Sequence, residues 1–260
     1  MRVLLTNDDG VQAPGIAALC RAIERRPGME VTVSAPERER SAVGHAITLH
    51  KPLHAYPVEV AGAKSPAFSV SGTPADSTKI AVLALMAQRP DLVISGINRG
   101  ANVGADVMYS GTVSAALEAT LMDIPAIAVS LGGFEKLDYG PAAEFIADMT
   151  EQLARAPLPD APYLLNVNVP LGPRTEMAGV AVTRLGLRYY DDFIVKREDP
   201  RGRPYYWLSG EVRDTEKEPA EPGTDIWALA NHLVSITPLR FAFTDEDLRQ
   251  ALEPWAEGLL

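Results

Sequence analysis

Two adjacent aspartates near the start of the chain are the first residues whose types could do chemistry. Asp8 and Asp9 follow a short apolar run, Val3–Thr6, and precede Gly10. Neighbouring carboxylates at a buried strand end repel each other, so one is protonated or a cation binds between them. Oxygen ligands favour Mg²⁺, Mn²⁺ or Ca²⁺, whereas zinc prefers histidine and cysteine. The alternative is a turn capped by aspartate, which is the commoner reading of an isolated Asp-Asp-Gly.

A glycine-rich stretch at residues 96–111 is the second candidate. It contains four glycines and two asparagines, Asn98 and Asn102, and at its end Ser110, Gly111 and Thr112 open a predicted helix. Glycine lets the backbone approach a ligand, and a helix N-terminus presents unpaired N–H groups to phosphate. The stretch therefore predicts a phosphate cradle, with an ordinary helix cap on a surface loop as the alternative.

Two familiar nucleotide-binding patterns are missing from the sequence. The stretch has no Gly-Lys-Ser/Thr of a Walker A loop. The turn after the first predicted strand has Gly10 and Gly15 but not the dinucleotide spacing, which argues against NAD as a cofactor.

A third candidate segment, residues 35–45, contains Ser41, Gly44 and His45. Ser41 taken alone fits a solvated loop hydroxyl. No pair of the four histidines forms a zinc motif, and the Gly-x-Ser-x-Gly turn of a serine hydrolase is missing. Cys20 lies on the apolar face of a predicted helix and is expected in the core.

The elements that must position these residues alternate between strand and helix. Apolar runs predict strands, and apolar residues three and four apart predict helices. The predicted strands are 3–6, 31–33, 92–95, 126–130 and 163–169, and the predicted helices are 14–23, 74–86, 111–122 and 141–155. This order predicts an α/β fold, a three-layer, doubly wound, mostly parallel sheet of Rossmann-like type. Ligands bind beyond the carboxyl ends of such strands, so the three candidate segments should converge there.

The rest of the chain has a different pattern. Aromatic-rich segments in 177–213 predict a β-hairpin, and the charged, proline-containing stretch 214–225 predicts a loop. A strand at 233–236 and a helix at 244–252 follow, with a capping box at Thr244 and Asp247. We expect one domain over 1–260, with a core at 1–170 and a hairpin and C-terminal dimerisation region at 177–260.

Composition excludes several classes of protein. The 260 residues carry 34 acidic and 24 basic side chains, a net charge of −10, which argues against a nucleic-acid polymer as partner. A single cysteine excludes a disulfide scaffold. No apolar run is long enough for a membrane helix, and the first residues lack a signal-peptide profile, so we expect a cytoplasmic protein without membrane association.

Five motifs in this order resemble one known family. They are 6–10 (TNDDG), 39–45 (ERSAVGH), 71–76 (SGTPAD), 95–104 (SGINRGANVG) and 109–113 (YSGTV). The chain closely resembles the survival protein E (SurE) family, and the match continues through Tyr206-Trp207 and Val234–Pro238. The resemblance implies a SurE-type fold and a metal-dependent nucleotidase acting on nucleoside 5′- and 3′-monophosphates. Some family members also trim short polyphosphate.

The resemblance also implies roles for individual residues. The divalent cation, Mg²⁺ or Mn²⁺ before Ca²⁺, would be held by Asp8, Asp9, Ser41 and Asn98. Phosphate would be bound by Asn98, Ser110, Gly111 and Thr112. A homodimer or homotetramer would form through the hairpin and an exchanged C-terminal segment. One departure is Glu118-Ala119, where members usually have Glu-Gly.

Our mechanistic hypothesis makes Asp8, Asp9 and Asn98 catalytic around a metal-activated water. Gly44 and His45 would contact the substrate, and His45 or a metal-bound water would protonate the leaving oxygen. A covalent aspartyl-phosphate enzyme is a rival, although its Asp-x-Asp pattern is replaced here by adjacent acids. A nucleotide sensor without turnover is a second rival.

Overall fold

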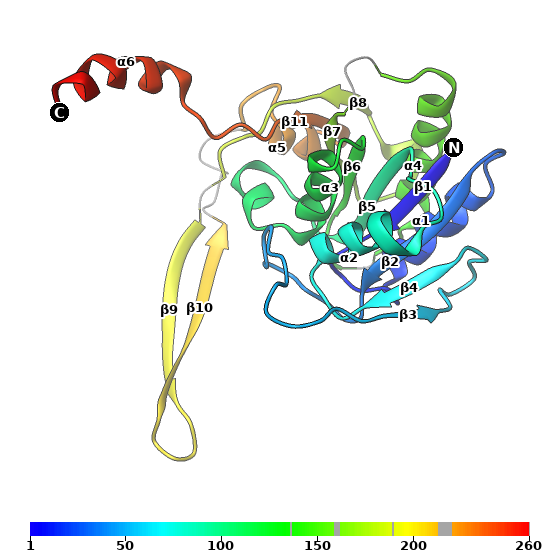
Figure 1. The fold of residues 1–260 in the computed structure, drawn as a ribbon, viewed down its shortest axis with the longest axis horizontal. Coiled ribbons are helices and arrows are strands. Elements are labelled where there is room, and N and C mark those ends of the chain that lie inside the picture. The colour runs from blue at the N-terminus through cyan, green and yellow to red at the C-terminus, as the bar shows by residue number, and fades with distance from the viewer. Residues whose placement is uncertain (136, 159–161, 189, 213–219, 260) are drawn as a thin grey trace.

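The computed structural model describes residues 1–135, 137–158, 162–188, 190–212 and 220–259. Within them, a nine-stranded sheet carries helices on both faces, and a separate two-stranded hairpin projects from it (Figure 1). In spatial order the sheet contains β3 (Ala55–Val58), β4 (Ala67–Val70), β2 (Glu30–Pro36), β1 (Arg2–Thr6), β5 (Leu92–Arg99), β6 (Ala126–Gly132), β7 (Leu164–Pro170), β11 (Leu233–Leu239) and β8 (Gly179–Val182).

The strand directions confirm the predicted fold class. The central strands β4, β2, β1, β5, β6 and β7 pair in parallel, while β3 and β11 pair antiparallel to β4 and β7. Strands β11 and β8 add a further parallel pair at one edge, so part of the region after residue 177 lies in the same sheet as the core.

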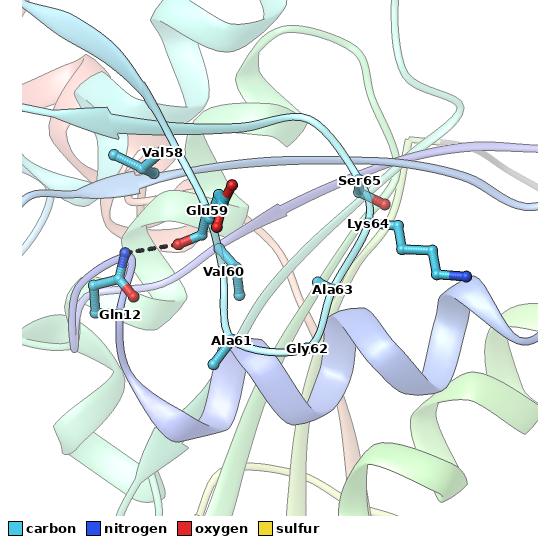
Figure 2. Close-up of a pocket in the computed structure, with 9 residues that line it drawn as sticks. All are labelled: Gln12, Val58, Glu59, Val60, Ala61, Gly62, Ala63, Lys64 and Ser65. Carbon is cyan, nitrogen blue, oxygen red and sulfur yellow. Dashed lines mark hydrogen bonds between the residues drawn. The ribbon is translucent and has the colours of Figure 1, made fainter.

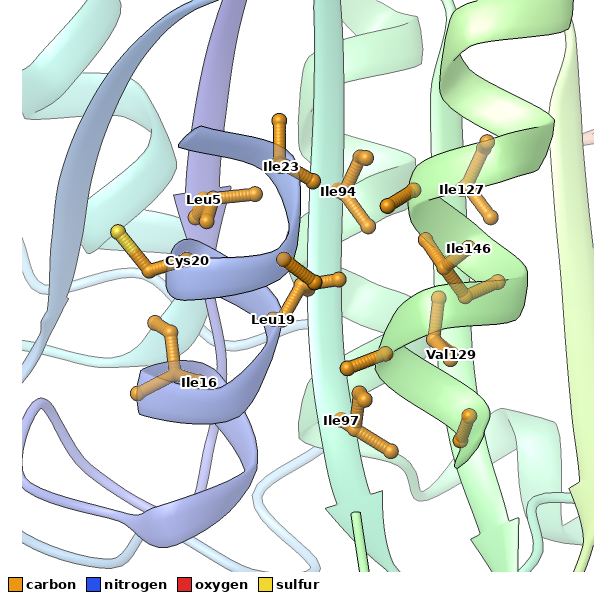
Figure 3. Packing of buried hydrophobic residues seen from close by; sticks show 14 of the residues in the cluster. Leu5, Ile16, Leu19, Cys20, Ile23, Ile94, Ile97, Ile127, Val129 and Ile146 are labelled. Atoms are coloured by element: carbon orange, nitrogen blue, oxygen red, sulfur yellow. The ribbon is translucent and has the colours of Figure 1, made fainter. Parts of the chain in front are cut away.

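Two pairs of helices form the outer layers. Helices α1 (Pro14–Glu24) and α4 (Gly140–Arg155) pack on one face of the sheet. Helices α2 (Pro74–Ile80) and α3 (Gly111–Leu121) pack on the other, and α2 continues into the wider π-helical turn η1 (Ala81–Leu85). Figure 3 shows the first interface, where side chains of α1 and α4 pack against alternate residues of the central strands.

The alternation of side chains along the strands explains why both faces are covered. Leu5 and Ile94 lie in the cluster under α1 and α4, whereas their neighbours Leu4 and Val93 lie in the cluster under α3. All four side chains are fully buried. Strands that are apolar on both faces need helices on both sides, and the order of helices in the sequence provides them.

Several predicted elements are confirmed, and others need correction. The predicted strand at 92–95 extends through Asn98 to Arg99, so part of the predicted loop belongs to β5. Strands β3 and β4 were not predicted, and the predicted loop at 214–225 ends in a short helix, α5 (Asp225–Ala230). Residues 214–219 of that loop lie outside the described part of the chain.

The predicted capping box at Thr244 is wrong by one residue. Helix α6 (Glu246–Ala256) is capped by Asp245, whose side chain accepts a hydrogen bond from Leu248 N at 2.9 Å. An N-cap side chain accepts this bond from a residue two or three positions later, and Asp245 is the residue at that spacing. The described helices include none that is long and apolar enough to cross a membrane.

The predicted hairpin is confirmed as β9 (Tyr190–Glu198) and β10 (Pro204–Val212), which pair antiparallel and extend away from the sheet (Figure 1). The segment at 179–182, which we expected in the hairpin region, instead joins the main sheet as β8. Large apolar side chains on the hairpin are exposed, among them Ile194, Trp207 and Leu208.

Candidate functional site

The three candidate segments meet at the carboxyl ends of the central strands. Thr6 of β1 lies opposite Ser95 of β5, so the residues that follow them leave the sheet side by side. The loop after β2 reaches the same place, since Arg40 N donates to the backbone oxygen of Asp8 at 2.7 Å. The convergence predicted from the parallel sheet is therefore confirmed.

The turn after β1 is fixed by Asn7 and Gly10. Asn7 is fully buried, and its side chain donates to Gly10 O at 2.9 Å and accepts from Gly10 N at 3.1 Å. Gly10 has a φ of +104°, which only glycine adopts without strain. Sequence reasoning assigned no role to Asn7, although its place before the two aspartates is that of an Asx-turn residue. The turn orients Asp8 and Asp9 before any ligand binds.

Asp8 lies against the first turn of α3. Its side chain accepts a hydrogen bond from the Thr112 hydroxyl, and Asp8 is only 4% exposed. A Cβ atom on Gly111 would lie 2.6 Å from Asp8 Cβ and 2.9 Å from its Oδ2, so only glycine permits this approach. Burial raises the pKa of Asp8 to about 6, the Thr112 hydrogen bond opposes the rise, and the nearby charge of Asp9 adds to it.

Asp9 is partly open to solvent beside Asp8. Its Oδ2 accepts a hydrogen bond from Arg99 N at 3.2 Å. Burial raises the pKa of Asp9, the Arg99 amide opposes the rise, and the charge of Glu39 adds to it. Two neighbouring carboxylates with raised pKa values are costly to ionise together, and a bound divalent cation would offset that cost.

The other expected cation ligands, Asn98 and Ser41, are next in sequence to Arg99 and Arg40, whose backbone amides contact Asp9 and Asp8. The Asn98 side-chain amide donates to Gly100 O at 2.9 Å, so its carbonyl oxygen is the atom left for a ligand. Ser41 is exposed, and its hydroxyl donates to Glu39 Oε1 at 2.7 Å rather than to either aspartate. Among the described residues, no group of three or more His, Cys, Asp and Glu side chains could hold a metal. An all-oxygen site here would therefore need Asn98 and a hydroxyl besides the aspartates, and that donor set suits a hard cation.

The predicted phosphate cradle is the N-terminus of α3. Ser110 is the N-cap, and its hydroxyl oxygen accepts from Val113 N at 3.1 Å. Gly111 and Thr112 are the first two helical residues, and N–H groups at these positions have no acceptor within the helix. The Asp8 carboxylate contacts this same turn, so the predicted phosphate-binding amides lie beside the paired carboxylates.

The loop with Gly44 and His45 is hydrogen-bonded to α3 and to Tyr109, which precedes the helix cap. Gly44 N donates to Tyr109 O at 3.0 Å, just before the helix. His45 Nε2 lies 2.8 Å from Glu118 Oε2, and Lys79 forms an ion pair with the other oxygen of Glu118. The Glu118 side chain is nearly buried, and the His45 hydrogen bond, followed by that of Lys79, lowers its pKa.

Two further anchors hold the glycine-rich stretch: Asn102, whose structural role the sequence did not indicate, and Asp225, which was not among the candidate residues. Asn102 is tied to the sheet by Asn166, Asn168 and Ser130, through bonds of 2.8–3.0 Å. Asp225 is fully buried and accepts from its neighbour Ile226 N and from two distant backbone amides, Gly104 N at 2.9 Å and Gly186 N at 2.8 Å. The only signal for Asp225 was its position after Thr224, which caps α5.

A cavity of about 530 Å³ lies elsewhere, between α1 and the turn that joins β3 to β4 (Figure 2). It is lined by Gln12 and residues 58–65, and Gln12 Nε2 donates to Glu59 O at 2.9 Å. None of the candidate site residues lines it, so this cavity is separate from the paired aspartates and the phosphate cradle.

Comparison with known proteins identifies the family of the chain. The family model described as "Survival protein SurE" matches residues 3–192. The chain belongs to the SurE family. It is similar to "5'-nucleotidase SurE" of Symbiobacterium thermophilum, with 50% identity over 253 residues that cover 97% of each chain. The protein of the same name from Gloeobacter violaceus is 50% identical over 247 residues, 95% of this chain and 92% of the relative.

A solved structure matches the whole fold. The crystal structure of the SurE protein from Aquifex aeolicus superimposes with a TM-score of 0.82 at 36% identity, covering 98% of this chain and 100% of the other. The SurE membership and the three-layer fold expected from the motifs are therefore confirmed.

Proposed function

We propose that this chain is a metal-dependent phosphomonoesterase that hydrolyses nucleoside 5′- and 3′-monophosphates to nucleoside and phosphate, with short polyphosphate as a second substrate class. The observation that carries the proposal is the contact of Asp8, the neighbour of Asp9, with the N-terminus of α3. Paired carboxylates bind a cation, and helix amides bind phosphate, which are the two needs of metal-assisted phosphate hydrolysis. The name of the relatives, 5′-nucleotidase, supports a nucleotide substrate.

One divalent cation per subunit, Mg²⁺ or Mn²⁺, would be held by Asp8, Asp9, Asn98 and Ser41. The raised pKa values of both aspartates support this, since a cation offsets the cost of burying two neighbouring carboxylates. When bound, such a cation supplies charge neutralisation and a water of lowered pKa as nucleophile.

The side chains and amides around that position have distinct tasks in the proposal. The N–H groups of Gly111 and Thr112 and the Ser110 hydroxyl donate to the phosphoryl oxygens, where negative charge grows in the transition state. Asp9, the more exposed of the two aspartates, orients the attacking water and accepts its proton. His45 protonates the leaving nucleoside oxygen, and Gly44 provides the close backbone approach beside it.

We further propose a homodimer or homotetramer located in the cytoplasm. Exposed apolar side chains on the hairpin, such as Ile194 and Leu208, and on α6, such as Leu252 and Trp255, support an assembly through these two projecting segments. A single cysteine in the sequence supports a reducing compartment.

Phosphate release tests the proposal directly. Wild-type protein is incubated with a panel of nucleoside 5′- and 3′-monophosphates and short polyphosphate, with Mg²⁺, Mn²⁺ or Ca²⁺ and then with EDTA. We expect release that EDTA abolishes. Asp8→Asn should end turnover while circular dichroism shows an intact fold. Asp123→Asn is the matched control, because Asp123 is exposed and asparagine tolerates its positive φ.

Two outcomes would contradict the proposal in different ways. Turnover that persists in EDTA or in Asp8→Asn would refute the metal assignment. Absence of phosphate release from every substrate with every cation, by folded wild-type protein, would refute the activity and favour a nucleotide sensor.

A further inference from the structure

Tyr109 stands directly before the phosphate cradle. It follows the short 3₁₀ helix η2 (Gly104–Met108) and precedes Ser110, the N-cap of α3. Consecutive Cα atoms are ~3.8 Å apart, so Tyr109 is close to the amides that would hold a phosphate. A ligand anchored there by its phosphate has the rest of its structure within reach of this side chain.

The backbone of Tyr109 is fixed on both sides. Tyr109 N donates to Asp106 O at 3.1 Å, and Tyr109 O accepts from Gly44 N at 3.0 Å. The Asp106 carboxylate forms an ion pair of 2.7 Å with Arg188, which ties η2 to the segment before the hairpin. The backbone that carries the Tyr109 side chain is therefore ordered before a ligand binds. Binding does not have to offset the entropy cost of ordering it.

The Tyr109 side chain is exposed to solvent. Tyr109 is 69% exposed, although a tyrosine usually buries its ring and leaves only the hydroxyl in water. The preceding residue, Met108, is exposed as well. An ordered backbone therefore holds the exposed Tyr109 side chain beside the proposed phosphate-binding residues.

We propose that Tyr109 is the surface on which the base of the nucleotide stacks, and that it gives the site its preference for nucleotides over phosphomonoesters without a base. The proposal rests on the proposed phosphatase activity and deepens it. Every base has an aromatic face, and stacking on a side chain tolerates all of them. Tyr109 therefore selects nucleotides as a class and does not choose among bases.

The test compares substrates with and without a base. We would measure kcat/KM for the four common nucleoside 5′-monophosphates and for ribose 5-phosphate, in wild type, Tyr109→Ala and Tyr109→Phe. Loss of a stacking side chain weakens binding by about 5- to 150-fold per base. Tyr109→Ala should lower the ratio of nucleotide to ribose 5-phosphate kcat/KM by that factor, mainly through KM. Tyr109→Phe should keep the wild-type ratio.

Phe134 provides a matched control. It is an aromatic residue with 72% exposure, and its ring lies against the Gly100 position, outside the phosphate cradle. Phe134→Ala removes a comparable exposed ring and should leave the substrate ratio unchanged. A changed ratio in Phe134→Ala with a wild-type ratio in Tyr109→Ala would overturn the assignment.

Other outcomes are also decisive. If Tyr109→Ala lowers kcat/KM equally for the nucleotides and for ribose 5-phosphate, with or without a change of oligomeric state, the side chain has a structural role and the proposal fails. If wild type releases no phosphate from nucleotides, the proposed activity fails separately. Calorimetric dissociation constants for adenosine 5′-monophosphate and ribose 5-phosphate in the same variants then decide the role of Tyr109.

Discussion

Replacing Asp8 with asparagine should stabilise the metal-free protein at neutral pH while it ends turnover. Asp8 is almost completely buried, and desolvation outweighs the Thr112 hydrogen bond that favours its charged form. Asparagine keeps the size of the side chain, and its carbonyl oxygen can still accept from Thr112. The variant therefore removes a buried charge and retains the main contact.

The size of the effect follows from the pKa. The pKa of Asp8 rises from 3.8 to about 6 in the folded protein. Each pKa unit corresponds to about 1.4 kcal/mol, so the ionised carboxylate destabilises the folded state by up to about 3 kcal/mol. For a chain of this length, that corresponds to a rise in Tm of about 6–12 °C when the charge is removed.

The upward shift of the Asp8 pKa determines the pH range in which the two proteins differ in stability. Because the folded pKa of Asp8 is raised, the folded state binds the proton more tightly than the unfolded state does. The contribution of the protonated Asp8 to the stability of the folded state is complete below pH 3.8 and is lost as the pH rises through about 6. The stability of wild type relative to Asp8→Asn should therefore fall between these values, and the two proteins should be alike near pH 4.

The assay is thermal or urea unfolding in EDTA at fixed protein concentration, between pH 4 and pH 8. Asp91→Asn is a control of opposite sign, because the Arg2 hydrogen bond lowers the pKa of Asp91. That variant should lose stability at neutral pH. If Asp8→Asn unfolds at or below the wild-type temperature at pH 7.5, or if the difference persists at pH 4, the reasoning from charge burial is wrong.

Three further predictions concern the residues that support the site. Glu118→Gln weakens the bonds to His45 and should lower the free energy of unfolding by about 1–3 kcal/mol and raise KM, as urea titration and kinetics would show. Gly111→Ala places a methyl group 2.6 Å from Asp8 Cβ and should destabilise by about 1–3 kcal/mol with loss of phosphate release. Asp225→Ala removes the acceptor of two buried loop amides, whose hydrogen exchange should become faster while the rest of the sheet stays protected.

Each of these predictions can fail. An unchanged urea midpoint and KM in Glu118→Gln would mean that His45 is held by other contacts. Full turnover in Gly111→Ala would mean that Asp8 need not touch the helix. Unchanged amide exchange in Asp225→Ala would show that the glycine-rich stretch is held without that carboxylate.

The sequence was most informative where function follows from periodicity and strand order. Alternating apolar strands and helices predicted the parallel sheet, and the rule that loops gather at the carboxyl ends of strands predicted that Asp8 and Asn98 lie at one edge. The short strand β3 at the edge of the sheet and its neighbour β4 escaped prediction because four-residue segments carry little periodic signal.

The supporting residues were harder to predict for a different reason. Glu118 meets His45 across 73 positions of sequence, and Asp225 meets Gly104 across 121. A lone acidic residue has the same local appearance whether it is solvated or buried against a distant amide. Its role depends on which elements fold beside it, and local patterns do not contain that information.

Helix α3 connects these observations, because three parts of the candidate site attach to it or to the residues just before it. Its first turn contacts Asp8, the residue before its cap is Tyr109, and its buried face holds His45 through Glu118. A cation, a phosphate and a nucleoside bound as proposed would all be positioned by one rigid element. A shift of α3 relative to β1 would then disturb all three together. Variants that loosen its packing on β6, far from the carboxylates, should therefore lose turnover before they lose the fold.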